Sequence, residues 1–376
     1  MRILCAIDSF KGSLTSLEVA LAAKEGILRV NKHHCVDVLP LGDGGEGTME
    51  AILGPGAKMV CTTINYPDGS EGDSSYAVLN DGMVVIESAK AVGLTLIPVD
   101  RRDPMILSSV GLGQLIMHAY SNNYRKFLIT LGGSGTNDGG TGMLYSMGVR
   151  FKDSDGKDLS PNLCGLAGLS SIEVPDSFTE IVNSCSFTVA SDVNNPLCGD
   201  NGASRVFGPQ KGLKEADIKT ADDILLSYGL MSDILLHKNN VDFPGGGAAG
   251  GLGFALVSYL EAELVSGAMA VIERNDVERL IIDSDLVISG EGRIDSQTLM
   301  GKGTGIIKNL ADKYHKRVLF FAGCTKDEKL LNDAGLEFYS IDPGGMTVEE
   351  LMDNKQASIN LKNKVVEVID SLNLSD

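Results

Sequence analysis

The sequence contains no tryptophan, and aromatic residues make up only 5% of its 376 residues. A buried core must therefore consist mainly of aliphatic side chains. The seven cysteines are scattered and form no C-x-x-C pair, which argues against a disulfide framework or a zinc site and favours a reducing compartment. No run of 18 apolar residues occurs, so we expect no membrane span. The first apolar run, residues 3–7, is too short for a signal peptide, and we expect a cytoplasmic protein.

Positive charge is scarce as well, because the formal net charge at pH 7 is −18. Nucleic acids and anionic membrane surfaces are polyanions that bind basic patches, so we expect neither as a partner. If the substrate is itself an anion, individual Lys or Arg side chains must supply the positive charge at its site. Cations that lie in glycine-rich loops are therefore the main candidates.

Several common catalytic motifs are missing. The sequence has no G-x-x-x-x-G-K-[ST] P-loop, no H-E-x-x-H and no G-x-S-x-G, which excludes these routes to nucleotide binding, zinc hydrolysis and serine-triad chemistry. Residues 245–250 match G-x-G-x-x-G, but no buried strand precedes them and no acidic residue ends a strand about 20 residues later. The segment is instead a phosphate-facing loop of another kind or a point of close packing.

The first and last parts of the chain share one pattern. Residues 3–7 and 36–39 are short apolar runs typical of buried parallel strands, and residues 285–289, 317–322 and 337–341 repeat this pattern near the C-terminus. Between the first two runs, Thr15 and Glu18 form a capping box for a helix with an apolar stripe, whose members are Leu14, Leu17, Leu21 and Leu28. Five strands separated by helices indicate one doubly wound α/β sheet.

The middle of the chain has a different pattern of polarity and turns. Segments 58–65, 75–80 and 83–88 alternate in polarity and are separated by Pro-Asp-Gly and Asn-Asp-Gly turns, which is typical of hairpins. We expect a mixed α/β domain at residues 58–265, inserted into a domain formed by residues 1–57 and 266–376. The active site would lie in the cleft between the two domains. Two consecutive domains that divide near residue 180 are the alternative.

Glycine is abundant, at 45 residues, and much of it lies in loops that also carry carboxylates and cations. Phosphoryl transfer requires such loops, because backbone N–H groups and cations neutralise phosphate charge, while carboxylates hold Mg²⁺ or accept the hydroxyl proton. In an open parallel sheet, ligands bind beyond the carboxyl ends of the strands where the strand order reverses. With the order 2-1-3-4-5, loops 8–11 and 290–295 would meet at that point.

Together these loops resemble the glycerate kinase type-1 family of bacterial D-glycerate kinases. Seven segments occur in the family's order over residues 1 to about 345: Asp8-Ser9-Phe10-Lys11 with Ser13-Leu14, Asp43-Gly44-Gly45-Glu46-Gly47-Thr48, Gly132-Gly133-Ser134 with Thr136-Asn137-Asp138-Gly139-Gly140, Asp192 with Asn194-Asn195-Pro196-Leu197-Cys198-Gly199, Phe207-Gly208-Pro209-Gln210-Lys211-Gly212, Gly250-Gly251-Leu252-Gly253, and Gly290-Glu291-Gly292-Arg293 with Asp295-Ser296-Gln297-Thr298. The resemblance implies ATP-dependent phosphorylation of D-glycerate with Mg²⁺, with 2-phosphoglycerate favoured over 3-phosphoglycerate as product. It also implies a flavodoxin-like domain that carries an inserted α/β domain.

The sequence departs from this family after Gly301-Lys302. Family members usually continue with Val-Pro-Ile-Gly, whereas this chain has Gly303-Thr304-Gly305-Ile306. The change weakens a functional assignment for Lys302, but it removes no charged motif residue.

Loop chemistry and topology lead to a hypothesis for each site residue. The catalytic candidates are Asp192 or Asp8 as the base, with Lys11 and Arg293 as cations for the glycerate carboxylate or the transferring phosphoryl group. Ser9 and Asn194 join Lys11 and Arg293 as substrate-binding candidates. The ATP-binding candidates are Gly133, Ser134, Thr136, Asn137, Lys211, Gly250 and Gly251. The Mg²⁺ candidates are Asp43, Glu291 and Asp295.

Two other functions stay open at this stage. The first is a kinase for another small hydroxy acid or sugar acid on the same scaffold, and the second is a nucleotide-binding regulatory protein without catalysis. The sequence is compatible with a monomer or a homodimer. The expected partners in every case are small molecules: ATP and an acid such as D-glycerate.

Overall fold

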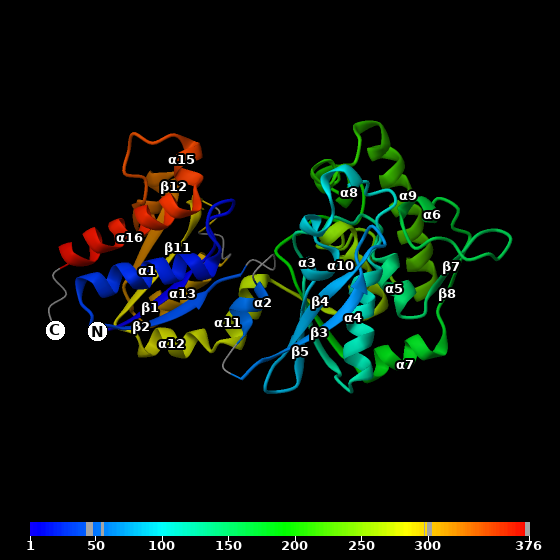
Figure 1. The fold of residues 1–376 in the computed structure, drawn as a ribbon, viewed down its shortest axis with the longest axis horizontal. Helices are drawn as coiled ribbons and strands as arrows, with labels where there is room; N and C mark the ends of the chain where they lie inside the picture. Colours follow the sequence, from blue (N-terminus) through cyan, green and yellow to red (C-terminus); the bar gives the residue numbers. More distant parts are fainter. Residues whose placement is uncertain (43–47, 54–55, 297, 299–302, 373–376) are drawn as a thin grey trace. The chain divides into compact units, whose positions relative to one another are not determined.

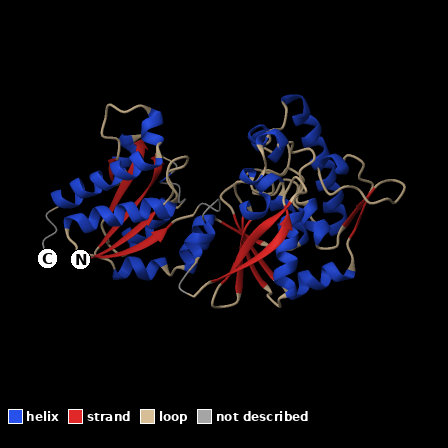
Figure 2. Cartoon of the chain, viewed as in Figure 1, coloured by secondary structure: helices blue, strands red, loops and turns tan. Residues whose placement is uncertain are grey.

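The two predicted N-terminal strands and the three predicted C-terminal strands form one parallel sheet (Figures 1 and 2). The computed structural model describes residues 1–42, 48–53, 56–296, 298 and 303–372. In the sheet the order is β13-β12-β11-β1-β2, which confirms the predicted doubly wound α/β arrangement. The strands are β1 (Arg2–Ile7), β2 (Cys35–Pro40), β11 (Leu286–Ile294), β12 (Val318–Thr325) and β13 (Glu337–Ser340).

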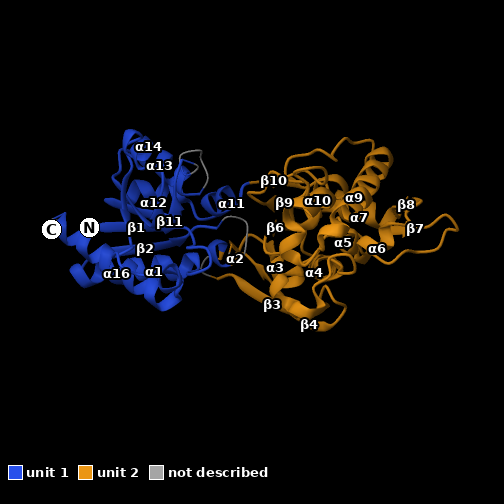
Figure 3. Ribbon diagram, turned by 90° about the horizontal axis from the view of Figure 1, so that it is seen from above, with its two compact units in different colours: residues 1–43, 50–52, 266–376 blue, residues 44–49, 53–265 orange. Residues whose placement is uncertain are grey.

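Contacts divide the chain into two compact units, which Figure 3 distinguishes by colour. Unit 1 contains residues 1–43, 50–52 and 266–376, and unit 2 contains residues 44–49 and 53–265. The assignment of residues 58–265 as a domain inserted into residues 1–57 and 266–376 stays a prediction.

Helices cover both faces of the unit 1 sheet, with α1 and α16 packed together on one face and α12 and α13 on the other (Figure 3). The helices assigned to this part of the chain are α1 (Ser16–Val30), α2 (Thr48–Ile52), α11 (Gly267–Arg274), α12 (Val277–Asp283), α13 (Thr304–Lys313), α14 (Glu328–Asp333), α15 (Val348–Met352) and α16 (Asn354–Ser371). Helix α2 straddles the division, since Thr48 and Met49 belong to unit 2. The predicted capping box of α1 is confirmed, because Thr15 and Glu18 bond reciprocally.

The apolar stripe predicted for α1 is wrong at two positions. Leu17 and Leu21 are exposed, whereas the buried face includes Ala22, Ala23 and Gly26. These small residues let α16 approach closely, which a count of large apolar residues does not reveal.

Unit 2 is built on a mixed six-stranded sheet of order β10-β9-β6-β5-β4-β3. Strands β5, β6, β9 and β10 are parallel, and β3, β4 and β5 pair in antiparallel fashion as the hairpin pattern predicted. The predicted strand 75–80 starts earlier and runs as β4 over Glu71–Val78. The other strands are β3 (Lys58–Asn65), β5 (Met83–Glu87), β6 (Lys126–Thr130), β9 (Ser186–Ala190) and β10 (Glu263–Val265), and β7 (Arg150–Lys152) pairs separately with β8 (Ser171–Glu173).

The helices of unit 2 surround an aliphatic and aromatic core that includes Tyr76, Phe127 and Phe254. They are α3 (Ala89–Val92), α4 (Val110–Ser121), α5 (Thr141–Ser146), α6 (Leu163–Leu166), α7 (Asp176–Ser184), α8 (Ala203–Phe207), α9 (Glu215–Leu236) and α10 (Leu252–Tyr259). Short 3₁₀ turns are η1 (Leu94–Leu96), η2 (Val99–Arg101), η3 (Pro209–Lys211) and η4 (Ala248–Gly250). Among the helices of the described residues, none has both the length and the hydropathy needed to cross a bilayer.

Candidate active site

The loop after β1 places Asp8 at the carboxyl end of β1, which lies between β11 and β2 in the unit 1 sheet. The backbone N–H of Asp8 donates to the Gly290 carbonyl at 2.9 Å, which joins the loop to β11. Its Oδ1 accepts a hydrogen bond from the Ser9 N–H at 2.6 Å and one from the Ser16 hydroxyl at 3.4 Å. The carboxylate is therefore held in one orientation, and Lys11 follows on an exposed turn.

The segment 290–294 is strand rather than loop, which corrects the sequence-based expectation. β11 continues to Ile294 because β12 is long enough to pair with it, and Glu291 lies opposite Ala322 in the register. The N–H of Gly292 donates to the Ser9 carbonyl at 3.3 Å. A side chain at Gly292 would begin 3.2 Å from the Phe10 Cα, so the close approach of the two backbones favours glycine at this position. The structure thus brings together the segments that strand order predicted would meet.

Charged side chains follow along this end of β11. Glu291 Oε1 accepts hydrogen bonds from the hydroxyls of Thr298 and Thr304, both at 2.8 Å. Arg293 Nε lies 3.1 Å from Asp295 Oδ2, with the arginine side chain 54% exposed and the aspartate 15% exposed. Thr304 belongs to the segment that departs from the family pattern, and a proline there could not make this bond.

The predicted Mg²⁺ ligands are only partly described. Asp43 lies outside the described residues, as does Lys302. Within the described ranges, no group of three or more His, Cys, Asp or Glu side chains is arranged to hold a metal ion. The assignment of Glu291 and Asp295 as ligands stays a prediction, and their chemistry is compatible with it because Mg²⁺ usually takes one or two carboxylates and completes its shell with water and substrate phosphates.

In unit 2, the side chain of Lys211 packs against the glycine-rich loop 132–140 and is only 3% exposed. Its Nζ donates to Ser134 Oγ at 2.9 Å and to the Thr136 carbonyl at 2.7 Å. Burial lowers the pKa of Lys211 to about 7, and the negative charge of Asp138 opposes that shift. Ser134, Thr136 and Lys211 are therefore joined by hydrogen bonds in the interior of unit 2.

Asp138 is a buried carboxylate that was not among the site residues predicted from the sequence. It accepts hydrogen bonds from the N–H and hydroxyl of Ser109 at 2.7 and 2.8 Å, and from the N–H groups of Gly140 and Gly142, both at 3.1 Å. Burial raises the pKa of Asp138, and these hydrogen bonds oppose the rise. Asp138 thereby fixes the end of the loop and the start of α5.

The glycines of the 245–251 segment serve close packing. A side chain at Gly250 would begin 2.0 Å from the Thr136 carbonyl oxygen, and one at Gly251 would begin 2.6 Å from the Gly139 Cα. Asn137 is fully buried beside them and donates to Ser204 Oγ at 2.9 Å. Of the two roles that the sequence left open for residues 245–250, the contacts support packing at Gly250. Gly133, by contrast, is exposed.

Two further acidic residues lie where the parallel strands of the unit 2 sheet end. Asp192 follows β9 and is partly buried, and Asn194 after it is exposed. Glu87 ends β5 and is 3% exposed, with Oε2 accepting the Met49 N–H at 3.2 Å. The sequence prediction missed Glu87, because a single Glu at the end of an apolar run forms no motif.

The model of the Glycerate kinase family matches residues 3–373, nearly the whole length of the chain. The chain belongs to this family. It is 41% identical over 331 residues to glycerate 2-kinase from Escherichia coli (strain K12), with 87% of this chain and 86% of the relative covered. It is 38% identical over 358 residues to glycerate kinase from Bacillus subtilis (strain 168), with 94% of each chain covered.

The fold of this chain also agrees with that of a solved structure. A crystal structure assigned as glycerate kinase 2 from Salmonella typhimurium LT2 superimposes with a TM-score of 0.83 at 38% identity, covering 99% of this chain and 98% of that one. As a glycerate kinase family member, the protein is a phosphotransferase that uses an alcohol group as acceptor. This decides against the alternative of a regulatory protein without catalysis.

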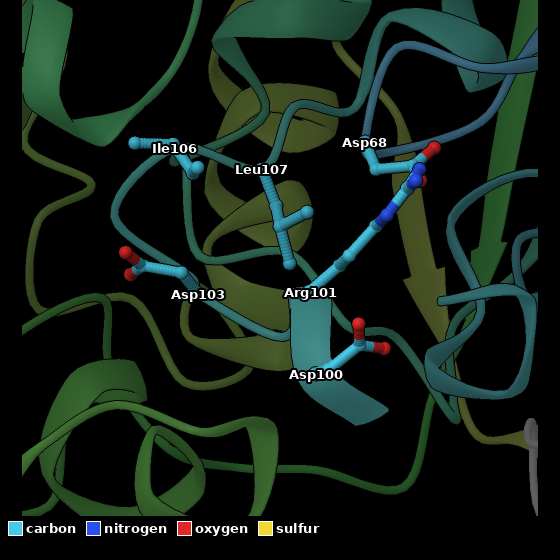
Figure 4. Close-up of a pocket in the computed structure, with 6 residues that line it drawn as sticks. All are labelled: Asp68, Asp100, Arg101, Asp103, Ile106 and Leu107. Atoms are coloured by element: carbon cyan, nitrogen blue, oxygen red, sulfur yellow. The ribbon is translucent and has the colours of Figure 1, made fainter. Parts of the chain in front are cut away.

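A hollow of about 360 Å³ in unit 2 of this glycerate kinase family member contains none of the predicted site residues (Figure 4). It is lined by Asp68, Asp100, Arg101, Asp103, Ile106 and Leu107. Arg101 points toward Asp68 and pairs with it at 3.1 Å. The remaining carboxylates would repel an anionic substrate, so the hollow is a poor candidate for binding phosphate or glycerate.

Proposed function

We propose that the protein transfers the γ-phosphoryl group of Mg-ATP to a hydroxyl group of D-glycerate, with 2-phosphoglycerate as product. Family membership supports the glycerate kinase reaction. The observation that carries the proposal at the level of residues is the junction of the Asp8–Ser9 loop with β11, where Gly290 and Gly292 bond to it. This junction puts Asp8, Arg293 and Glu291 on neighbouring segments. In the proposed reaction they would serve as a base, a cation and a metal ligand.

The proposed substrate contacts use the exposed groups of this junction and of the loop after β9. Lys11 and Arg293 would bind the glycerate carboxylate or the transferring phosphoryl group, with Ser9 and Asn194 as hydrogen-bonding partners. Asp8 or Asp192 would accept the hydroxyl proton, since either carboxylate can act as a general base. The location of the site in a cleft between the two predicted domains stays a prediction.

The proposed nucleotide contacts use the loop at 132–140. Its backbone and Ser134, Thr136, Asn137 and Lys211 would form the phosphate-binding wall, with Gly250 and Gly251 packed behind it. Mg²⁺ would be held by Glu291, Asp295 and Asp43, directly or through water. The ion would neutralise charge on the phosphates during transfer.

A coupled assay for ADP release with Mg²⁺, ATP and D-glycerate tests the proposal. L-glycerate and buffer alone serve as controls, and enolase without phosphoglycerate mutase reports whether the product is 2-phosphoglycerate. We expect turnover that depends on D-glycerate and product that enolase consumes directly. Turnover that enolase cannot follow would contradict the 2-phosphoglycerate assignment, and ATP hydrolysis that ignores glycerate would contradict the proposed reaction.

A second candidate function is phosphorylation of another small hydroxy acid or sugar acid. Residues 303–305 differ from the usual family sequence, and Thr304 within them bonds directly to the proposed metal ligand Glu291. A change so near the proposed metal site favours this second candidate as an alternative substrate class. A panel of hydroxy acids and sugar acids in the same assay separates the two. A kcat/KM for another acid that exceeds the value for D-glycerate would select this second candidate.

A further inference from the structure

Arg102 has a guanidinium group that no carboxylate neutralises within the part of the chain that the structure describes. Its Nε donates to the Ile97 carbonyl and its Nη2 to the Leu94 carbonyl, both at 3.3 Å. The side chain is partly buried. The neighbouring Arg101 differs, because it is 63% exposed and paired with Asp68. Arg102 is therefore a cation that two carbonyl oxygens hold in position and that has no carboxylate partner among the described residues.

The location of Arg102 links it to the glycine-rich loop. Leu94, which binds its guanidinium, donates its own N–H to the Gly133 carbonyl at 2.8 Å. On the other side, a side chain at Gly212 would begin 2.6 Å from the Arg102 carbonyl oxygen and 3.2 Å from its Cβ. Arg102 thus lies between the loop at 132–140 and the residue that follows Lys211.

The two cations beside this loop differ in what they can still bind. Lys211 is almost fully buried and uses two of its three N–H groups on Ser134 and Thr136. Arg102 has five N–H groups, of which two donors are used by carbonyls. The remaining capacity to bind an anion from outside therefore lies mainly with Arg102.

We propose that Arg102 makes the main cationic contact with a phosphate group of the nucleotide, whereas Lys211, within the phosphate-binding wall, mainly holds the loop in shape. The assignment rests on the proposed function. An arginine suits this role because its planar guanidinium presents several donors and can form two parallel bonds to phosphate oxygens. Two carbonyl contacts orient the group before the ligand arrives, so less conformational entropy is lost on binding.

The test compares Arg102→Met with Arg101→Met, a matched substitution one residue away. Isothermal titration of the full-length variants gives Kd values for MgATP, ADP, AMP and D-glycerate. We expect Arg102→Met to weaken MgATP binding by about 10- to 100-fold, as befits a lost charge-assisted bond, with a smaller effect on AMP. Arg101→Met should bind as the wild type does. Arg102→Lys should fall between, since lysine keeps the charge and loses the planar fork.

Each other outcome counts against the assignment. Wild-type affinity for MgATP in Arg102→Met would overturn it, and so would a selective loss of D-glycerate binding. Equal losses for ATP and AMP together with a lowered Tm would show a structural role instead. A wild-type protein that binds no ATP would overturn the proposed function and this assignment with it, whereas normal ATP binding in Arg102→Met would overturn this assignment alone.

Discussion

The buried ammonium group of Lys211 should make the stability of the protein depend on pH. Burial lowers its pKa to about 7 in the folded state, whereas the ordinary value of 10.5 applies to the unfolded chain. Between these values the unfolded chain binds more protons, so this group makes the free energy of unfolding rise with pH. The rise is at most about 1.4 kcal/mol per pH unit for one proton.

Lys211→Met removes this dependence and provides the measurement. Urea unfolding followed by circular dichroism at pH 7, 8 and 9 gives the difference in unfolding free energy between wild type and variant. We expect that difference to shift in favour of the wild type as the pH rises. A difference that stays constant over this range would contradict a buried Lys211 with a lowered pKa.

Arg293 should matter for turnover far more than for folding, because its side chain is half exposed and forms an ion pair with Asp295. Replacing it by Ala removes the proposed cation and its ion pair with Asp295. We expect kcat/KM for D-glycerate to fall by about 100-fold or more, the scale seen when one stabilising donor is lost from a reaction site. Arg279→Ala is the control, since Arg279 is also exposed and pairs with Asp283. Near-normal turnover in Arg293→Ala would rule out the role.

At the scale of elements, the packing of η4 against the glycine-rich loop can be tested through Gly250. Its φ is +72°, and an added Cβ would meet the Thr136 carbonyl oxygen at 2.0 Å. Gly250→Ala combines overpacking with left-handed strain and should destabilise unit 2 by about 3 kcal/mol. Gly69→Ala is the control, because φ is +83° there and nothing lies within 4 Å of the added Cβ. We expect about 1 kcal/mol for the control in thermal unfolding, and equal losses would refute the packing argument.

The elements show what could be predicted from sequence. The five strands of the unit 1 sheet and the capping box of α1 follow from local patterns, namely apolar runs and a Thr-x-x-Glu spacing. The strand order was assumed from the doubly wound arrangement and does not follow from any local pattern. The stripe at Leu17 and Leu21 was wrong, because the buried face of α1 is determined by α16. At Gly26 an added Cβ would lie 2.9 Å from the Lys362 carbonyl oxygen, and no local pattern reports a partner 336 positions away.

The same distinction applies to the candidate site. Loops 8–11 and 290–295 could be predicted to meet, because the carboxyl ends of neighbouring parallel strands share one edge. The bonds from Ser109 to Asp138 and from Arg102 to Leu94 could not be, since each joins residues without a shared motif. The exact length of β11 could not be predicted either, because it depends on pairing with β12 up to Thr325.

At the scale of the whole molecule, each unit has a hydrophobic core of its own. One core joins residues of unit 1 such as Ile3 and Leu361, and another joins residues of unit 2 such as Phe127 and Leu256. We therefore expect two calorimetric unfolding transitions. MgATP at about 100 times its Kd should stabilise the unit 2 transition by about 2.7 kcal/mol, because the proposed nucleotide contacts of Arg102 and the 132–140 loop lie there.

Gly250→Ala shows which transition belongs to which unit, since it should lower the Tm of the unit 2 transition only. Differential scanning calorimetry with and without MgATP then measures the shift. A single transition that moves as a whole in every sample would contradict the expectation of two cooperative units.

The order of strands in the unit 1 sheet also bears on how the protein is made. The N–H of Arg2 bonds to Asp285, a partner 283 residues further along, and β1 pairs with β11. At roughly 5–20 residues per second, the ribosome needs roughly 15–60 s to supply that partner. Residues 53–265 are synthesised completely within this interval. The part of the chain that is synthesised first is thus completed last, and the aliphatic edge of β1 must be kept from aggregating until then.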